Sequence, residues 1–184
     1  MTRTDLFILV VVLFLALLVS VAIYYLLRMR KASTATWSSL MGRLVAVDRN
    51  RIAIVALDLV DETGQPREGG DPEIEPDSLW DLVGGMDGLE ALEKNCEVLI
   101  DLAFYVQRWH PEALVVTEQL RLNAREIQWH VARLKGAAQT GNLASSFPQY
   151  AQRAVATYYL MTRHLLELYE RGNLTEFAQL QAVL

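Results

Sequence analysis

The segment Gly88–Trp109, "GLEALEKNCEVLIDLAFYVQRW", carries the clearest pattern in the chain. Its apolar positions recur at alternating spacings of three and four residues, at Leu89, Leu92, Cys96, Leu99, Ala103 and Val106. This spacing sets the side chains in one row along a helix, which predicts packing against nearly parallel or antiparallel neighbours. A second row beside it consists of Val98, Leu102, Tyr105 and Trp109. Together the rows form the wide apolar face that a helix needs inside a bundle.

Two further long helices are predicted downstream, over residues 111–137 and 148–171. Pro111 follows His110 directly, so it ends the first helix and starts the second at the first turn, where proline is tolerated. Because short links between long helices imply antiparallel neighbours, the pattern predicts an up-down bundle. The residues expected to face its core are Val116, Leu120, Ile127, Val131, Leu134, Ala151, Val155, Tyr158, Leu165 and Tyr169.

Turn-forming residues mark both ends of the third helix. Gly136, Gly141 and "SSFP" at 145–148 predict the connection before it, with the proline opening the helix. Gly172, in "RGN", stands where helices commonly end on a cap glycine. A last short helix is predicted over 174–184, so the predicted bundle region covers residues 79–184 and begins with a short helical turn.

Upstream of the bundle, residues 61–78 form a loop, "DETGQPREGGDPEIEPDS". It holds three prolines and three glycines, and its dense acidic charge is relieved only by Arg67. Such a composition buries too little apolar surface to order itself. The loop is therefore either a solvated linker or an acidic strap held in place by a basic partner surface.

Residues 32–60 connect this loop to the N-terminal segment, and helical spacing of Leu40, Leu44 and Val47 predicts a helix from Trp37. Residues 51–60, "RIAIVALDLV", are rich in β-branched side chains and are compatible with a strand of a hairpin. They are also compatible with a helix capped by Asp48. We favour the helix, because a lone hairpin without further strands is marginally stable.

The N-terminal segment Leu6–Leu27, "LFILVVVLFLALLVSVAIYYLL", contains no charge, proline or glycine. As a helix its twenty-two residues extend about 33 Å, close to the ~30 Å hydrocarbon core of a bilayer. Ser20 and Ala22 would also serve as a signal-peptide cleavage site, and a buried soluble helix is a third alternative. We predict a retained span, because the stretch exceeds the usual length of a signal core and Arg3 is offset by Asp5.

The residues after the span predict how it sits in the membrane, within an anchor region covering residues 1–31. Tyr24 and Tyr25 are expected at the headgroup level, followed by the cations Arg28, Arg30 and Lys31. Positive residues concentrate on the cytoplasmic side of spans, so the N-terminus is predicted outside and the C-terminal domain in the cytoplasm. The expected location is the cell membrane, as in the inner membrane of a bacterium.

The sequence thus predicts an all-α protein, with a single N-terminal transmembrane helix followed by a soluble antiparallel helical bundle. The net charge of −5 argues against nucleic-acid binding, which needs clustered cations. The lone cysteine, Cys96, excludes an internal disulfide and any paired-cysteine metal site within the chain. The span contains no side chain that ligates a haem or chlorophyll metal. We therefore expect no cofactor and no metal.

The titratable residues do not form a recognisable catalytic pattern. His130 follows Glu126 by four residues, which places both on one helix face, but a bundle metal site needs paired Glu-x-x-His motifs. The chain has only the reverse order, at His164 and Glu167. "LVGGMDG" at 82–88 lacks the preceding strand and the lysine of a phosphate-binding loop. We predict no catalytic residue and identify no small-molecule substrate.

The candidate contacts with partner proteins are two small residues and four large aromatic residues, namely Ala16, Ser20, Trp37, Trp80, Trp129 and Tyr159. Ala16 and Ser20 form a small-xxx-small pair that lets another membrane helix approach. Large amphipathic rings are the usual anchors of protein interfaces. Trp129 also falls on a seven-spaced row with Leu122 and Val115, which meets either another helix of the same bundle or an external partner.

These patterns lead us to expect a non-catalytic accessory subunit that stabilises a larger membrane complex, for example a respiratory or photosynthetic one. Its partners would be the lipid bilayer and other membrane-protein subunits. A membrane-tethered recruitment module is the alternative. A helical-bundle metal enzyme is the least favoured reading, because it requires Glu126, His130, His164 and Glu167 to converge in one pocket.

Overall fold

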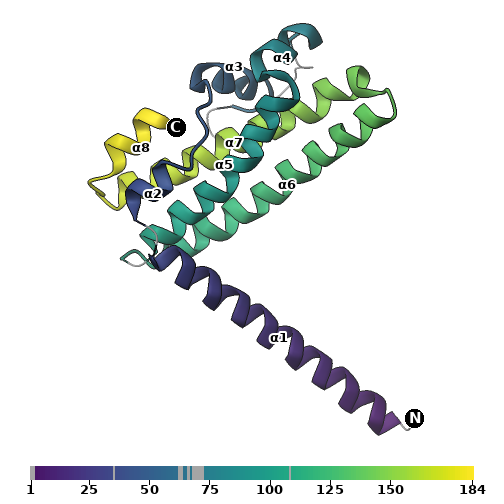
Figure 1. Cartoon of the computed structure of the whole chain (residues 1–184), viewed down its shortest axis with the longest axis vertical. Coiled ribbons are helices and arrows are strands. Elements are labelled where there is room, and N and C mark those ends of the chain that lie inside the picture. Colours follow the sequence, from purple (N-terminus) through teal and green to yellow (C-terminus); the bar gives the residue numbers. More distant parts are fainter. Residues whose placement is uncertain (1–2, 35, 62–63, 66, 68–72, 108) are drawn as a thin grey trace.

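The computed structural model describes residues 3–34, 36–61, 64–65, 67, 73–107 and 109–184, without the side chains of 3–4 and 24–34. The first helix, α1 (Arg3–Thr34), extends away from a bundle made of α5 (Gly85–Val106), α6 (Ala113–Gln139) and α7 (Leu143–Arg171). Figure 1 shows this division plainly, with α1 meeting the bundle only at the end where α5 finishes and α6 begins. The predicted all-α architecture is confirmed.

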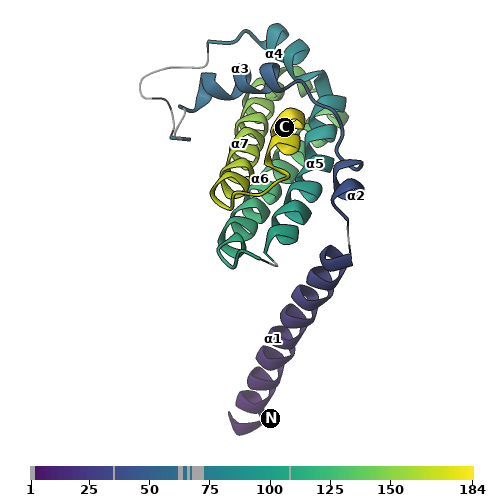
Figure 2. The same cartoon turned by 90° about the vertical axis from the view of Figure 1, so that its left-hand side faces the viewer.

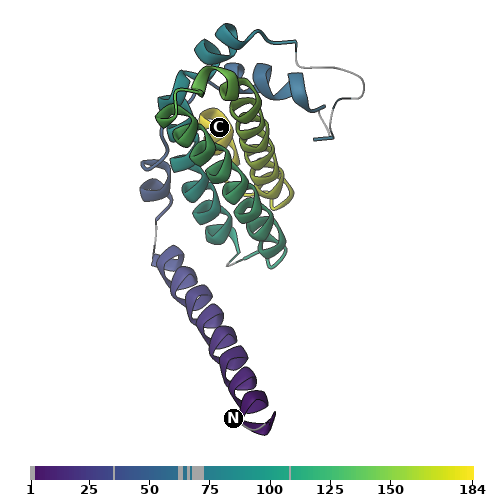
Figure 3. The same ribbon diagram turned by 90° about the vertical axis from the view of Figure 1, so that its right-hand side faces the viewer.

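The core lies between α5, α6 and α7, which run antiparallel to one another (Figures 1 and 3). Leu89, Cys96 and Leu99 of the predicted α5 row are completely buried. The matching residues of α6 and α7 also lie inside, including Ile127 and Tyr158. Val116 and Tyr105 are only half-buried, and Trp109 of the second predicted α5 row lies beyond the end of α5 and is 56% exposed. The spacing of apolar residues therefore identified the bundle and its inward faces.

A tight corner joins α4 (Pro76–Val83) to α5 and accounts for the glycines of "LVGGMDG". Gly84 and Gly85 have φ angles of +78° and +62°, in the left-handed region that favours glycine. A Cβ on Gly88 would lie 1.8 Å from the carbonyl oxygen of Val83, so only glycine fits there. These glycines allow the chain to turn sharply between α4 and α5.

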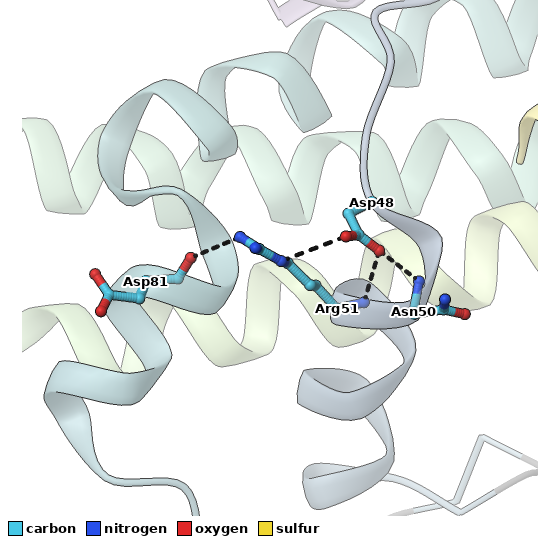
Figure 4. Close-up of polar contacts among 4 residues, drawn as sticks. All are labelled: Asp48, Asn50, Arg51 and Asp81. Carbon is cyan, nitrogen blue, oxygen red and sulfur yellow. Dashed lines mark hydrogen bonds and ion pairs between the residues drawn. The ribbon is translucent and has the colours of Figure 1, made fainter.

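The connecting region contains α2 (Trp37–Met41) and α3 (Arg49–Leu59). The helix favoured for residues 51–60 is thus observed, and Asp48 caps it as expected. Figure 4 shows the Asp48 carboxylate accepting hydrogen bonds from the backbone N–H groups of Asn50 and Arg51, at 3.0 and 3.2 Å. The Arg51 side chain lies 3.3 Å from the same carboxylate and donates to the carbonyl oxygen of Asp81 at 3.3 Å. This arginine links the start of α3 to α4.

The helix predicted through Leu44 and Val47 is wrong, because α2 ends at Met41 and the chain then continues without helix to Asp48. The buried side chain of Asn95 in α5 explains the difference. Its amide oxygen accepts from the Val45 N–H and its amide nitrogen donates to the Val45 carbonyl, both at 2.8 Å. Since Asn95 satisfies both backbone groups of Val45, an extended segment packs on α5 without a neighbouring strand.

The third long helix begins five residues earlier than predicted, at Leu143, and Pro148 lies inside it. A proline there removes a hydrogen bond to the carbonyl of Ala144, but Ala144 is exposed and water can take the place of the missing donor. At the other end Gly172 is the cap residue, yet its φ is −75°, and the left-handed conformation falls on Asn173 at +47°. The short last helix, α8 (Phe177–Val183), follows.

The smaller helices cover α7 and the end of the bundle remote from α1. Figure 2 shows α3 and α4 across that end, with α8 lying along the bundle and α2 beside α5. The Asp58 carboxylate of α3 accepts from the Gln152 side chain of α7 at 2.6 Å and from the backbone N–H groups of Glu73 and Ile74. Whether the acidic 61–78 loop is a linker or a strap stays a prediction, since much of it lies outside the described residues.

Candidate membrane and partner-contact surfaces

The apolar part of α1, Asp5–Ile23, is the strongest surface feature of the chain. Its mean hydropathy is 3.4 over nineteen residues, and none of it is buried by the rest of the described structure. Ser20 donates a hydrogen bond to the carbonyl oxygen of Ala16 at 2.8 Å, so its hydroxyl is satisfied within the helix. Length and composition make α1 able to span a membrane, and an N-terminal export signal has the same two properties.

The predicted interface anchors Tyr24, Tyr25, Arg28, Arg30 and Lys31 all lie in α1, after this apolar part. Their side chains lie outside the described residues. Their role at the headgroups, and the membrane orientation inferred from them, therefore stay predictions.

Trp37 and Tyr159, two of the candidate contact residues, are half-buried in the bundle. The Trp37 ring packs against Tyr105 and Tyr169, with centroids 6.1 and 5.8 Å away, and its indole N–H donates to Gln179 at 2.8 Å. Tyr159 lines a cavity of about 370 Å³ between α3, α7 and α8. The structure thus gives Trp37 an internal partner on α8, whereas Tyr159 borders an open space.

Trp80 remains 39% exposed at the end of the bundle remote from α1. Its ring lies 4.4 Å from that of Phe147, centroid to centroid, and rests against Gly85. Beside it opens a groove of about 310 Å³, lined by Pro76, Asp77, Trp80, Leu143, Ala144, Phe147 and Pro148. The lining is apolar except for one carboxylate, so the groove suits an apolar side chain next to a positive charge.

The row on α6 formed by Val115, Leu122 and Trp129 lies on the outside of the bundle, and these side chains are 75%, 58% and 49% exposed. Trp129 nevertheless meets another helix of the same bundle, since its ring lies 5.7 Å from that of Tyr150 in α7. Contact of the row with an external partner stays a prediction. Val115 and Leu122 stay exposed because α5 and α7 pack on the inner side of α6. The Arg133 guanidinium lies 5.1 Å from the centre of the Trp129 ring and shields one of its faces.

His130 is buried between α6 and α7, with only 2% of its surface exposed. Its ring lies 5.0 Å from Trp129 and 5.7 Å from Tyr150, and its Nε2 is 3.6 Å from the Glu126 carboxylate. Burial lowers the pKa of His130 below the ordinary 6.5, although the nearby Glu126 opposes this shift. A neutral, packed imidazole is what a structural histidine requires.

The other two histidines lie together at the other end of the bundle. His110 and His164 line a cavity of about 300 Å³ together with Glu112, Glu167 and Arg171. Neither Glu126 nor His130 lines it, so the four residues of the metal-enzyme hypothesis do not meet in one pocket. Among the described residues no group of three or more His, Cys, Asp and Glu side chains is arranged to hold a metal ion.

Cys96 is completely buried on the α5 row, and its thiol donates to the Leu92 carbonyl at 3.1 Å. Burial raises its pKa to about 12, which leaves the thiol protonated near neutral pH. Only the thiolate is a strong nucleophile, so this environment suits a packing residue.

Comparison with known proteins adds no identity to this geometry. No family model matches the chain, and neither a curated protein nor a solved structure gives a match.

Proposed function

We propose that this chain is a single-span membrane protein that acts as a non-catalytic accessory subunit, supporting a larger assembly of membrane proteins. The observation that carries the proposal is that none of the α1 span is buried by the rest of the described structure. Its large apolar side chains from Leu6 to Ile23 are between 38% (Val11) and 69% (Phe7) exposed. Lipid, or other helices within lipid, is the environment that covers such a surface.

The environments of the histidine and cysteine side chains in the bundle favour a structural role over catalysis. His130 is buried and paired with Glu126, and Cys96 is buried and protonated. Catalytic groups instead must reach a substrate and lie within hydrogen-bonding distance of one another. In this proposal the bundle lies on the cytoplasmic side, since Arg28, Arg30 and Lys31 follow the span whereas Arg3 precedes it.

The groove beside Trp80 is the protein-contact site in this proposal. It lies remote from α1, where a neighbouring subunit can reach it, and it offers an apolar floor with Asp77 at its side. Glu75 precedes Asp77 in the chain and is exposed as well. We propose that it receives an apolar side chain from a basic segment of another subunit, for instance in a respiratory or photosynthetic complex.

Recruitment of soluble partners to the membrane is the second candidate function. The exposed acidic residues Glu73 and Glu75, which precede α4, and Asp77 at the groove favour it, because they can attract basic partners from solution. The two functions differ in the partner: a stable integral membrane subunit in the first, and a dissociable soluble protein in the second.

Mild-detergent extraction of native membranes, followed by native mass measurement, tests the proposal. A photo-crosslinking aromatic amino acid in place of Trp80 should join the chain to a membrane subunit of the same complex. The control is the same amino acid at Val183 of α8, which is 44% exposed and does not line the groove. A protein that migrates as a monomer, with no crosslink at position 80, contradicts the accessory-subunit proposal.

A further inference from the structure

The outer face of α6 carries a straight apolar row that the bundle covers only in part, where the Trp129 ring lies 5.7 Å from that of Tyr150 in α7. Val115, Leu122 and Trp129 are spaced by seven residues, or two helical turns, so they follow one line of about 21 Å along the helix. All three are about half exposed or more. Single exposed apolar residues are ordinary on soluble proteins, whereas an aligned row on one helix marks a contact surface.

The helix that carries this row, α6, lies on the side of the bundle toward which α1 runs. In Figure 1, α6 is the long helix that lies between the rest of the bundle and the side where α1 extends. Figure 3, seen from that side, shows α6 running up the face turned toward the viewer. Because α5 and α7 pack on the inner side of α6, its outer face points in the general direction of the N-terminal end of α1.

The connection between α1 and the bundle is too short to hold this face far from a membrane. The helix continues for eleven residues beyond Ile23, about 16 Å, and only residues 35 and 36 separate it from α2. The headgroup layer on one side of a bilayer occupies roughly 5–8 Å of that length. The α6 side chains reach about 5 Å from the helix axis, which brings them to the level of the headgroups when α1 spans the bilayer.

The chemistry around Trp129 fits phosphate headgroups. Arg125 and Arg133 are exposed on the same part of α6, and Arg133 lies over the Trp129 ring. Arg153, exposed on α7, lies close enough to His130 to act on it electrostatically. Glu126, which pairs with His130, is the acidic residue on this part of the face. Three arginines beside one acid give a local charge of about +2 in a chain whose net charge is −5.

The half of the face nearer α1 is less basic. There Glu118 pairs with Arg121 at 3.3 Å, and Glu112 is exposed before the helix begins. An anionic surface therefore attracts mainly the half of the face around Trp129. Tryptophan is enriched where membranes meet water, and arginine binds phosphate through its planar guanidinium.

We propose that the outer face of α6 rests on the anionic headgroup surface of the bilayer that holds α1, with Leu122 and Trp129 at the interface and Arg125 and Arg133 on lipid phosphates. The bundle then lies with α6 against the membrane. The inference rests on the proposed function in one respect only, namely that α1 is in the bilayer.

The full chain in lipid nanodiscs of phosphatidylcholine and phosphatidylglycerol provides the test. Cys96 is buried and its thiol protonated, so a fluorophore attaches selectively to a new exposed cysteine. Leu122→Cys places the label on the face, and Ile54→Cys places it on α3 as the matched control, at 58% and 55% exposure. Lipids with a nitroxide on the headgroup quench labels that lie at the surface.

We expect quenching several-fold stronger at position 122 than at position 54. Reversal of two charges, Arg125→Glu with Arg133→Glu, should reduce quenching at 122 to the level at 54, with unchanged helix content by circular dichroism. Equal quenching at both positions in the parent chain overturns the proposal, as does excimer formation between pyrene labels at 122, which indicates pairing of two copies. A chain recovered outside the discs overturns the span itself, and so separates failure of the proposed function from failure of this inference.

Discussion

Two apolar helices of the same chain, α1 and α5, meet opposite environments. Leu13 of α1 is 61% exposed, whereas Leu99 of α5 is completely buried. The difference was already present in the arrangement of side chains, since α1 is apolar all round and α5 has apolar rows facing its neighbours and polar residues elsewhere. A one-sided helix is covered by protein, and an all-round apolar helix left uncovered by its own chain needs lipid.

The same substitution in both helices gives the largest contrast. Leu99→Ala removes three buried side-chain carbons from the bundle core and should lower its free energy of unfolding by about 3 kcal/mol. Leu13→Ala should change it by less than about 0.5 kcal/mol, because this side chain contributes nothing to the core. Urea unfolding of the detergent-solubilised chain, followed by circular dichroism, measures both. Equal losses from the two variants would mean that α1 packs on the bundle.

The next largest effect should come from Asn95, which joins α5 to the extended segment before α3. Asn95→Ala leaves the backbone groups of Val45 and the Tyr158 hydroxyl without their partner, and each unsatisfied buried group costs about 1–3 kcal/mol. Partial access of water to Val45 limits the total to about 2–3 kcal/mol. Thermal unfolding measures the loss. Lys94→Ala, at the adjacent exposed position, is the control and should unfold like the parent chain.

A smaller effect is expected at Tyr169, whose hydroxyl donates to the Leu102 carbonyl of α5 at 3.1 Å. Tyr169→Phe keeps the ring in the core and removes one buried hydrogen bond, which should lower the free energy of unfolding by about 1 kcal/mol. The same urea titration detects this change. A loss above that of Leu99→Ala would show that the hydroxyl has a larger role than one bond to α5.

The smallest expected effect is a pH dependence from His130. Its pKa in the folded chain lies below 6.5, so the unfolded chain takes up this proton at a higher pH than the folded chain. Stability from this group is therefore full above about pH 7 and declines as the pH falls through 6.5. His130→Gln should flatten the decline in a series of urea titrations between pH 7.5 and pH 5. An unchanged slope would assign the pH dependence to other groups.

The sequence predicted the bundle and its core well, because helical spacing directly encodes which faces are covered. It failed between Leu44 and Val47, where a contact with Asn95, about fifty residues away, overrides local spacing. Asn95 itself lies beside Cys96 in the segment of strongest apolar pattern, and a polar residue there is the one local hint of a buried clamp. Pro148 misplaced a helix start because α7 tolerates it in its interior, where the hydrogen bond it removes is to the carbonyl of the exposed Ala144.

The surfaces were harder to predict than the core. A seven-spaced row on α6 has the same pattern whether it faces protein or water. Only the three-dimensional packing shows that Trp129 meets Tyr150 of α7, whereas Val115 and Leu122 stay exposed. The Trp80 groove depends on the α4–α5 corner, which brings Pro76 and Trp80 against Phe147 and Pro148. Such sites arise from segments distant in sequence, so spacing along one helix cannot reveal them.

The membrane anchor is the central claim, and its most direct test is alkaline carbonate extraction of native membranes followed by intact-mass measurement of the protein. The account predicts that the protein stays with the membrane pellet and that its mass includes the complete Leu6–Leu27 segment. A soluble protein whose mass corresponds to a chain beginning after Ala22 would contradict it.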